Sequence, residues 1–143
     1  MTNKKVLLVD DEVEFTELLA ERMRNRDMDV DTADSGEKAA ELAQQKRYDA
    51  IIMDLAMPGM DGIETLKQLL QDNPDQQVVL LTGHATVPKS VEAIKHGAVE
   101  FLEKPADIDK LIEIVSRAKV KKSELTEKRM KESIEEIMKK RGW

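Results

Sequence analysis

Apolar side chains fall into short continuous runs along the first part of the chain. The clearest runs cover residues 6–9, 50–53 and 78–81, and each ends at or just before a polar residue. An unbroken apolar run of this length is typical of a strand that is buried on both faces of a sheet. Weaker apolar patterns predict two further strands at residues 28–33 and 99–102.

Helical spacing fills the segments between these strands, because apolar residues recur there at every third or fourth position. The stripes consist of Phe15, Leu18, Leu19 and Met23; Ala39, Ala40, Leu42 and Ala43; Ile63, Leu66, Leu69 and Leu70; and Val87, Val91 and Ile94. A fifth stripe starts near Asp107. Strand and helix therefore alternate five times, which predicts an α/β fold with a doubly wound, five-stranded parallel sheet covered by helices.

The fifth stripe continues beyond the length that a compact domain needs. Leu125 keeps its register, but the later apolar positions are shifted to Met130, Ile134, Ile137 and Met138. Lys122 and Arg129 stand where a long coiled coil would need apolar residues. We predict two amphipathic segments joined near Lys122–Ser123, with a domain over residues 1–121 and a helical extension over 122–143. An unbroken helix over residues 107–142 would be about 54 Å long.

The residues that follow the predicted strands carry the chemistry. Ligands of parallel α/β sheets bind at the carboxyl ends of the strands, and here those ends are followed by Asp10, Asp11, Asp54, Thr82 and Lys104. Crowded aspartates favour a hard divalent cation such as Mg²⁺. A lysine and a hydroxyl can bind phosphoryl oxygens. Together these groups suit phosphoryl transfer to a carboxylate.

Composition and charge exclude several other classes of protein. The chain has no cysteine, which rules out disulfides and thiolate metal sites. Its net charge is −6, with the acidic excess confined to the part up to Pro105, and this argues against broad nucleic-acid binding. No stretch approaches the roughly 20 apolar residues of a membrane span, and the N-terminal apolar run is too short for a signal peptide.

Four motifs at the predicted strand ends identify a family resemblance. They are Val9-Asp10-Asp11-Glu12, Asp54-Leu55-Ala56-Met57-Pro58-Gly59-Met60-Asp61-Gly62, Leu81-Thr82-Gly83-His84 and Phe101-Leu102-Glu103-Lys104-Pro105. Over about residues 4–120 the chain resembles the receiver domain of bacterial two-component response regulators. The resemblance implies a flavodoxin-like fold and a cytoplasmic signalling protein that is not an enzyme in the usual sense, although it promotes its own Mg²⁺-dependent phosphorylation and dephosphorylation.

The resemblance also assigns roles to individual residues. Asp54 would be the phosphoacceptor, and Mg²⁺ would be bound by Asp10, Asp11, Asp54 and the backbone carbonyl of Ala56. Thr82 and Lys104 would hold the phosphoryl oxygens. Phe101 would be the switch aromatic that moves inward with Thr82, and the Lys104–Pro105 peptide would be cis. Ala56 and His84 occupy positions that tune loss of the phosphoryl group in such domains.

Simpler interpretations of the same residues remain open at this point. Asp11 and Glu14 could form a helix capping box. Asp54 could be a solvated turn residue, Thr82 a helix cap and Lys104 a surface charge. Phe101 could be a core residue alone.

The leading functional hypothesis is a stand-alone receiver. It would accept a phosphoryl group from a histidine kinase or phosphotransfer protein and signal to an unknown downstream protein through the surface around the fourth helix, fifth strand and fifth helix. The alternative is the receiver portion of a DNA-binding transcriptional regulator, since the motifs most resemble receivers of enhancer-binding activators. We expect no membrane or direct nucleic-acid contact. The helical extension would form a homodimer, bind a partner or pack on the body.

Overall fold

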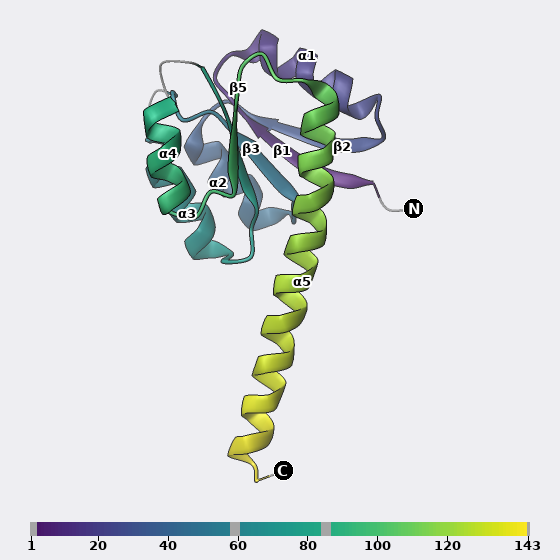
Figure 1. Cartoon of the computed structure of the whole chain (residues 1–143), viewed down its shortest axis with the longest axis vertical. Coiled ribbons are helices and arrows are strands. Elements are labelled where there is room, and N and C mark those ends of the chain that lie inside the picture. Colours follow the sequence, from purple (N-terminus) through teal and green to yellow (C-terminus); the bar gives the residue numbers. More distant parts are fainter. Residues whose placement is uncertain (1–2, 58–60, 84–86, 143) are drawn as a thin grey trace.

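All five predicted strands form one parallel sheet in the computed structural model, which describes residues 3–57, 61–83 and 87–142 (Figure 1). The strands are β1 (Lys4–Val9), β2 (Met28–Ala33), β3 (Ala50–Met53), β4 (Val78–Thr82) and β5 (Glu100–Glu103). Their order is β2-β1-β3-β4-β5. The predicted doubly wound fold is confirmed, with the last strand one residue later than expected. Pro58, Gly59, Met60 and His84 of the predicted loops lie outside the described residues.

The helices cover both faces of this sheet. They are α1 (Val13–Arg24), α2 (Gly36–Gln45), α3 (Gly62–Asp72), α4 (Val87–Lys95) and α5 (Ile108–Lys140). One buried cluster joins α1 and α5 to one side of the sheet, and a second joins α2, α3 and α4 to the other. Every residue of β3 and β4 is buried, as the unbroken apolar runs predict for strands between two helical layers.

The sheet register brings the ends of β1 and β3 together. The two strands are neighbours although β2 lies between them in the sequence, so the strand order changes direction here. Val9 pairs with Met53, and the backbone N–H of Asp54 donates to the Val9 carbonyl at 3.0 Å. Asp10 and Asp54 therefore leave adjacent strands side by side at the switch point, where ligands of such sheets bind.

The fifth helix is a single element, so the two amphipathic segments predicted to join near Lys122–Ser123 are parts of one continuous helix. α5 runs without interruption for 33 residues and extends well past the sheet, away from the strand ends that carry Asp10 and Asp54 (Figure 1). Its sequence contains no proline or glycine that would end it. The predicted boundary between residues 121 and 122 thus falls within a continuous helix. Among the described residues, no helix has the combined length and apolar character needed to cross a bilayer.

Lys122 and Arg129 interrupt the apolar register of α5 because both bind the body. Together with Thr126 they form a set of contacts that we call the polar clamp. The Lys122 ammonium donates to the backbone carbonyl of Tyr48 just before β3. Arg129 donates two hydrogen bonds to the carboxylate of Asp75, at 2.6 Å and 3.2 Å, and the Thr126 hydroxyl donates a third at 3.1 Å. The body therefore presents oxygen acceptors where the helix places polar side chains, and the first part of the extension is bound to the amino end of the sheet.

Asp75 is the centre of this clamp. Its side chain is only 7% exposed, and hydrogen bonds from Arg129 and then Thr126 outweigh its burial and lower the pKa of the carboxyl. A buried carboxylate needs such donors, because removing it from water is costly without them.

Gly62 allows α3 to rest directly on the chain that follows Asp54. A Cβ atom at this position would lie 2.7 Å from the Leu55 Cα and 2.8 Å from the Leu55 carbonyl oxygen. These neighbours are backbone atoms that cannot rotate away. The missing side chain thus sets the distance between α3 and the segment after β3.

Gly62→Ala should lower the free energy of unfolding by about 1–3 kcal/mol, because the added methyl overpacks a close backbone contact. Urea denaturation measures the change. Gly83→Ala is the matched control, since a Cβ there meets nothing within 4 Å. Equal stability of the two variants would show that the Leu55 contact is not restrictive.

Asp75→Asn should lower the melting temperature at neutral pH, with a difference from the wild type that shrinks in acid. A carboxyl whose folded pKa is depressed stabilises the protein above its ordinary pKa, here 3.8, and this contribution disappears as the pH falls through the folded value. Thermal denaturation from neutral to strongly acidic pH measures the trend. Asp72→Asn, at an exposed aspartate nearby, should show no comparable trend. A constant difference for Asp75→Asn would contradict the clamp.

Candidate functional site

Two buried carboxylates and one lysine form the centre of the site. The side chains of Asp10 and Asp54 are 7% and 6% exposed, and they follow the neighbouring strands β1 and β3. The Lys104 Nζ lies 2.6 Å from the Asp10 Oδ2 and 3.0 Å from the Asp54 Oδ2. Three residues that are far apart in the sequence therefore meet at one edge of the sheet, as the strand-end analysis predicts.

Both carboxylates are oriented in the same way. The backbone N–H of Glu12 donates to the Asp10 Oδ1 at 3.0 Å, and the backbone N–H of Ala56 donates to the Asp54 Oδ1 at 2.9 Å. Each aspartate thus binds the backbone two residues further on, in the manner of an Asx-turn. The second oxygen of each carboxylate accepts from Lys104. Contacts within the protein therefore fix the orientation of both side chains.

Lys104 is positioned by the end of β5. Its backbone N–H donates to the Thr82 carbonyl at 2.8 Å, and the Lys104–Pro105 peptide is cis, as the resemblance implies. The ammonium also lies 4.6 Å from the centre of the Phe15 ring, within range of a cation–π contact. Burial alone would lower the pKa of Lys104, but hydrogen bonds to Asp10 and Asp54 outweigh burial and raise the pKa above its ordinary value. The lysine therefore carries a positive charge at neutral pH.

Thr82 and Phe101 lie on neighbouring strands beside this centre. Thr82 is the last residue of β4 and is fully buried, so it is not a helix cap. Phe101 pairs with Leu80, which lies two residues before Thr82, so the two side chains belong to the same face of the sheet. Phe101 is half-buried against the cluster under α2, α3 and α4. It is both a core contact and a neighbour of the site.

The carboxylates that could share a metal ion differ from the predicted set. Within the described residues, oxygens of Asp10, Glu12 and Asp54 lie within 4.8 Å of one another, and Asp11 is exposed outside this group. The capping-box interpretation of Asp11 is wrong, because the N-cap of α1 is Glu12 and receives no side-chain cap. The oxygen donors nevertheless fit a hard divalent cation, and the predicted roles of Asp11 and the Ala56 carbonyl stay predictions.

Two residues at this site were not singled out from the sequence. The Glu12 carboxylate lies near those of Asp10 and Asp54, and its Oε1 is 3.7 Å from the Lys104 Nζ. The Phe15 ring contacts the Lys104 ammonium. The position of Glu12 directly after two aspartates is a signal that could have suggested its role. Phe15 gave no such signal, since it belongs to the apolar stripe of a helix.

The arrangement places a carboxylate, an ammonium and a hydroxyl, those of Asp54, Lys104 and Thr82, at the carboxyl ends of neighbouring parallel strands. An ionised aspartate is a nucleophile for phosphorus. A lysine beside it can stabilise the negative charge of a transferring phosphoryl group. The geometry suits acceptance of a phosphoryl group.

Comparisons with known proteins agree with this chemistry. The sequence model described as "Response regulator receiver domain" matches residues 6–116. The chain is 38% identical over 113 residues to the transcriptional regulatory protein ZraR of Klebsiella oxytoca, in a match that covers 79% of this chain and 26% of that protein. It is 38% identical over 115 residues to the C4-dicarboxylate transport transcriptional regulatory protein DctD of Pseudomonas aeruginosa, covering 80% and 25%. The chain thus spans about a quarter of the length of these relatives.

A solved structure gives the same result for the fold. The crystal structure of a response regulator receiver domain protein from Clostridium thermocellum matches with a TM-score of 0.81 and 27% identity, covering 85% of this chain and 98% of that one.

Asp11→Asn and Glu12→Gln should separate the two acids that could complete a metal site. If Asp11 is the ligand that the resemblance implies, Asp11→Asn should weaken Mg²⁺ binding by about tenfold or more, and Glu12→Gln should change it much less. Isothermal titration calorimetry measures both. If Glu12→Gln weakened Mg²⁺ binding more than Asp11→Asn did, the metal ligands would be Asp10, Glu12 and Asp54. Asp11 would then not belong to the site.

Proposed function

Because this chain belongs to the response regulator receiver domain family, we propose that it is a cytoplasmic receiver that is phosphorylated on Asp54. The observation that carries the proposal is the buried Asp54 carboxylate, with one oxygen bound to the Ala56 N–H and the other to Lys104. The donor is a histidine kinase or a histidine phosphotransfer protein. The family is a signalling domain, and this chain would itself promote both the gain and the loss of the phosphoryl group.

The transfer moves one phosphoryl group between two side chains. An oxygen of Asp54 attacks the phosphorus of the donor phosphohistidine, an O–P bond forms and the P–N bond breaks, and the imidazole leaves. Asp11, Asp54 and the Ala56 carbonyl would hold Mg²⁺, with Asp10 beside them. When bound, the ion would supply positive charge that offsets the crowded carboxylates and the incoming phosphoryl oxygens.

Lys104 and Thr82 would then change partners. The Lys104 ammonium, shared between Asp10 and Asp54 at 2.6 Å and 3.0 Å, would turn to a phosphoryl oxygen. The Thr82 hydroxyl, which makes a long contact of 3.5 Å to the Gly83 carbonyl, would hydrogen-bond another phosphoryl oxygen. Phe101 would follow Thr82 inward, because both occupy the same face of the sheet.

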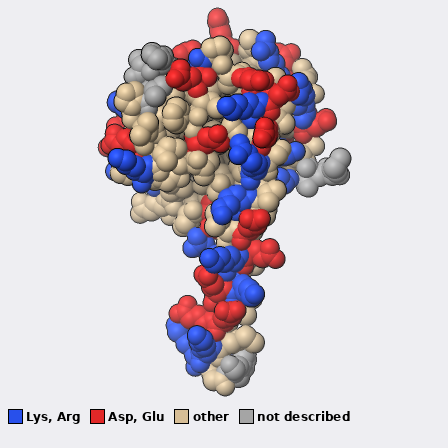
Figure 2. All heavy atoms as spheres, viewed as in Figure 1, with Lys and Arg blue, Asp and Glu red and all other residues tan. Residues whose placement is uncertain are grey.

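The output surface would be the face of α4, β5 and α5. Val91, Ile94 and Val99 are 49%, 38% and 46% exposed on α4 and the turn that leads to β5. Figure 2 shows uncharged surface on the α4 side of β5, while charged side chains, including the Arg117–Glu100 ion pair, lie between β5 and α5. Exposed apolar side chains that adjoin the switch residues suit a protein partner, and Phe101 connects this face to Thr82.

A second candidate is the receiver portion of a DNA-binding transcriptional regulator. The names of ZraR and DctD as transcriptional regulatory proteins favour it. Sequencing the gene on both sides of the coding segment would decide, since such a regulator needs further domains in the same reading frame.

Incubation with a small acyl phosphate and Mg²⁺ should add one phosphoryl group per chain, and Asp54→Ala should abolish the addition, because the proposal makes this carboxylate the nucleophile. Intact-protein mass spectrometry measures it. Asp34→Asn is the matched control, since Asp34 is an exposed aspartate that follows β2 at the same sheet edge. Equal labelling of Asp54→Ala and the wild type would refute the assignment. Affinity capture with phosphorylated and unphosphorylated protein would then identify the downstream partner.

A further inference from the structure

The distal part of α5 carries an apolar stripe that the body does not cover. Met130, Ile134, Ile137 and Met138 are 61%, 56%, 53% and 44% exposed. An apolar stripe at helical spacing normally faces a protein core. Here it lies on the segment that extends away from the body (Figure 1), among alternating basic and acidic side chains (Figure 2). Such a stripe requires a partner.

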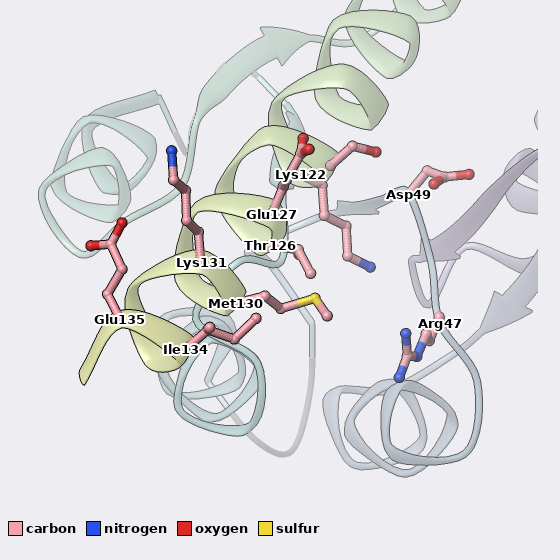
Figure 3. Close-up of a pocket in the computed structure, with 10 residues that line it drawn as sticks. Arg47, Asp49, Lys122, Thr126, Glu127, Met130, Lys131, Ile134 and Glu135 are labelled. Atoms are coloured by element: carbon pink, nitrogen blue, oxygen red, sulfur yellow. The ribbon is translucent and has the colours of Figure 1, made fainter. Parts of the chain in front are cut away.

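The polar clamp fixes the rotation of the extension about its own axis. Arg129 is bound to Asp75, and its neighbour Met130 points about 100° away around the helix. Figure 3 shows Met130 and Ile134 directed toward an open space that has Arg47 on its far side. This groove, about 840 Å³ in volume, lies between the extension and the Arg47–Asp49 segment. The stripe and the groove form one continuous surface.

Most of this face is complementary to itself when its sequence is reversed. Glu127, Met130, Ile134 and Met138 of α5 and the C-cap residue Arg141 follow one another in steps of three or four residues, so they lie on one side of the helix and are symmetric about Ile134. Ile137 borders this set and would face Lys131 of a reversed second helix. An antiparallel second helix would place Glu127 opposite Arg141 and Met130 opposite Met138. A parallel second helix would place Glu127 against Glu127 and Arg141 against Arg141. Charge complementarity therefore favours the antiparallel arrangement.

We infer that a second copy of this chain docks antiparallel on the α5 extension, with the twofold axis beside Ile134. A twofold contact uses the same patch on both copies, as this palindromic stripe requires. The extension of the second copy would run back toward the groove beside Arg47. From Glu127 to Arg141 the contact is about 21 Å long, so the dimer should be weak and concentration-dependent. The inference does not rest on phosphorylation of Asp54.

Cysteine crosslinking tests both the contact and its direction. The chain has no native cysteine, so Met130→Cys and Met138→Cys each introduce a single thiol. When the two variants are mixed and treated with a short thiol crosslinker, crosslinks between position 130 of one copy and position 138 of the other should dominate. In the antiparallel pair the same position on two copies is about 12 Å apart along the axis, too far for a direct bond. Dominant crosslinks between identical positions, or none at submillimolar concentration, would overturn the inference.

Charge reversal provides an independent test. Glu127→Arg and Arg141→Glu should each weaken the dimer by roughly threefold to tenfold, because two opposite-charge pairs become like-charge pairs. The double variant restores both pairs and should recover the wild-type dissociation constant in sedimentation equilibrium. Circular dichroism checks that the helix content is unchanged. A double variant as weak as the single ones, or single variants with no effect, would contradict the antiparallel register.

Discussion

Two carboxylates that are both ionised and buried side by side repel each other unless a cation lies between them. In this chain that cation is the Lys104 ammonium, which binds Asp10 and Asp54 at the ends of β1 and β3. Uncompensated, such charges would be costly to bury. The site therefore depends on the parallel sheet, because only a common direction of β1, β3 and β5 brings these three residues to one edge.

The surrounding structure serves to keep this arrangement in place. Backbone N–H groups of Glu12 and Ala56 orient the two carboxylates, and the backbone of Lys104 is bonded to the end of β4. Gly62 lets α3 press on the segment after Asp54. A change in the charge at Asp54 thus acts on contacts that reach three strands and the N-terminal end of α3.

The sequence was sufficient for the sheet and for the centre of the site, but not for contacts that depend on tertiary partners. The apolar runs at residues 50–53 and 78–81 could be assigned because a strand buried on both faces leaves a clear pattern. Asp10, Asp54 and Lys104 followed, since the ends of parallel strands meet. A C-terminal helical extension could be predicted, but its continuity with the fifth helix could not, because Lys122 and Arg129 occupy positions where a long coiled coil would need apolar residues.

Lys122 and Arg129 donate to Tyr48 and Asp75, which are distant from them in the sequence. No sequence pattern near Tyr48 or Asp75 marks them as acceptors. Glu12 lies close to Asp10 and Asp54 because of its side-chain conformation, which no pattern along the chain encodes.

The unbroken course of α5 has a mechanical consequence. The helix begins just after Pro105, beside the lysine of the site, and its 33 residues make a rod about 50 Å long. The buried face of its first turns and the contacts of Lys122, Thr126 and Arg129 all fix this rod on the body. About 17 Å of helix continues beyond Arg129, so any tilt of the packed part is carried undiminished to the tip.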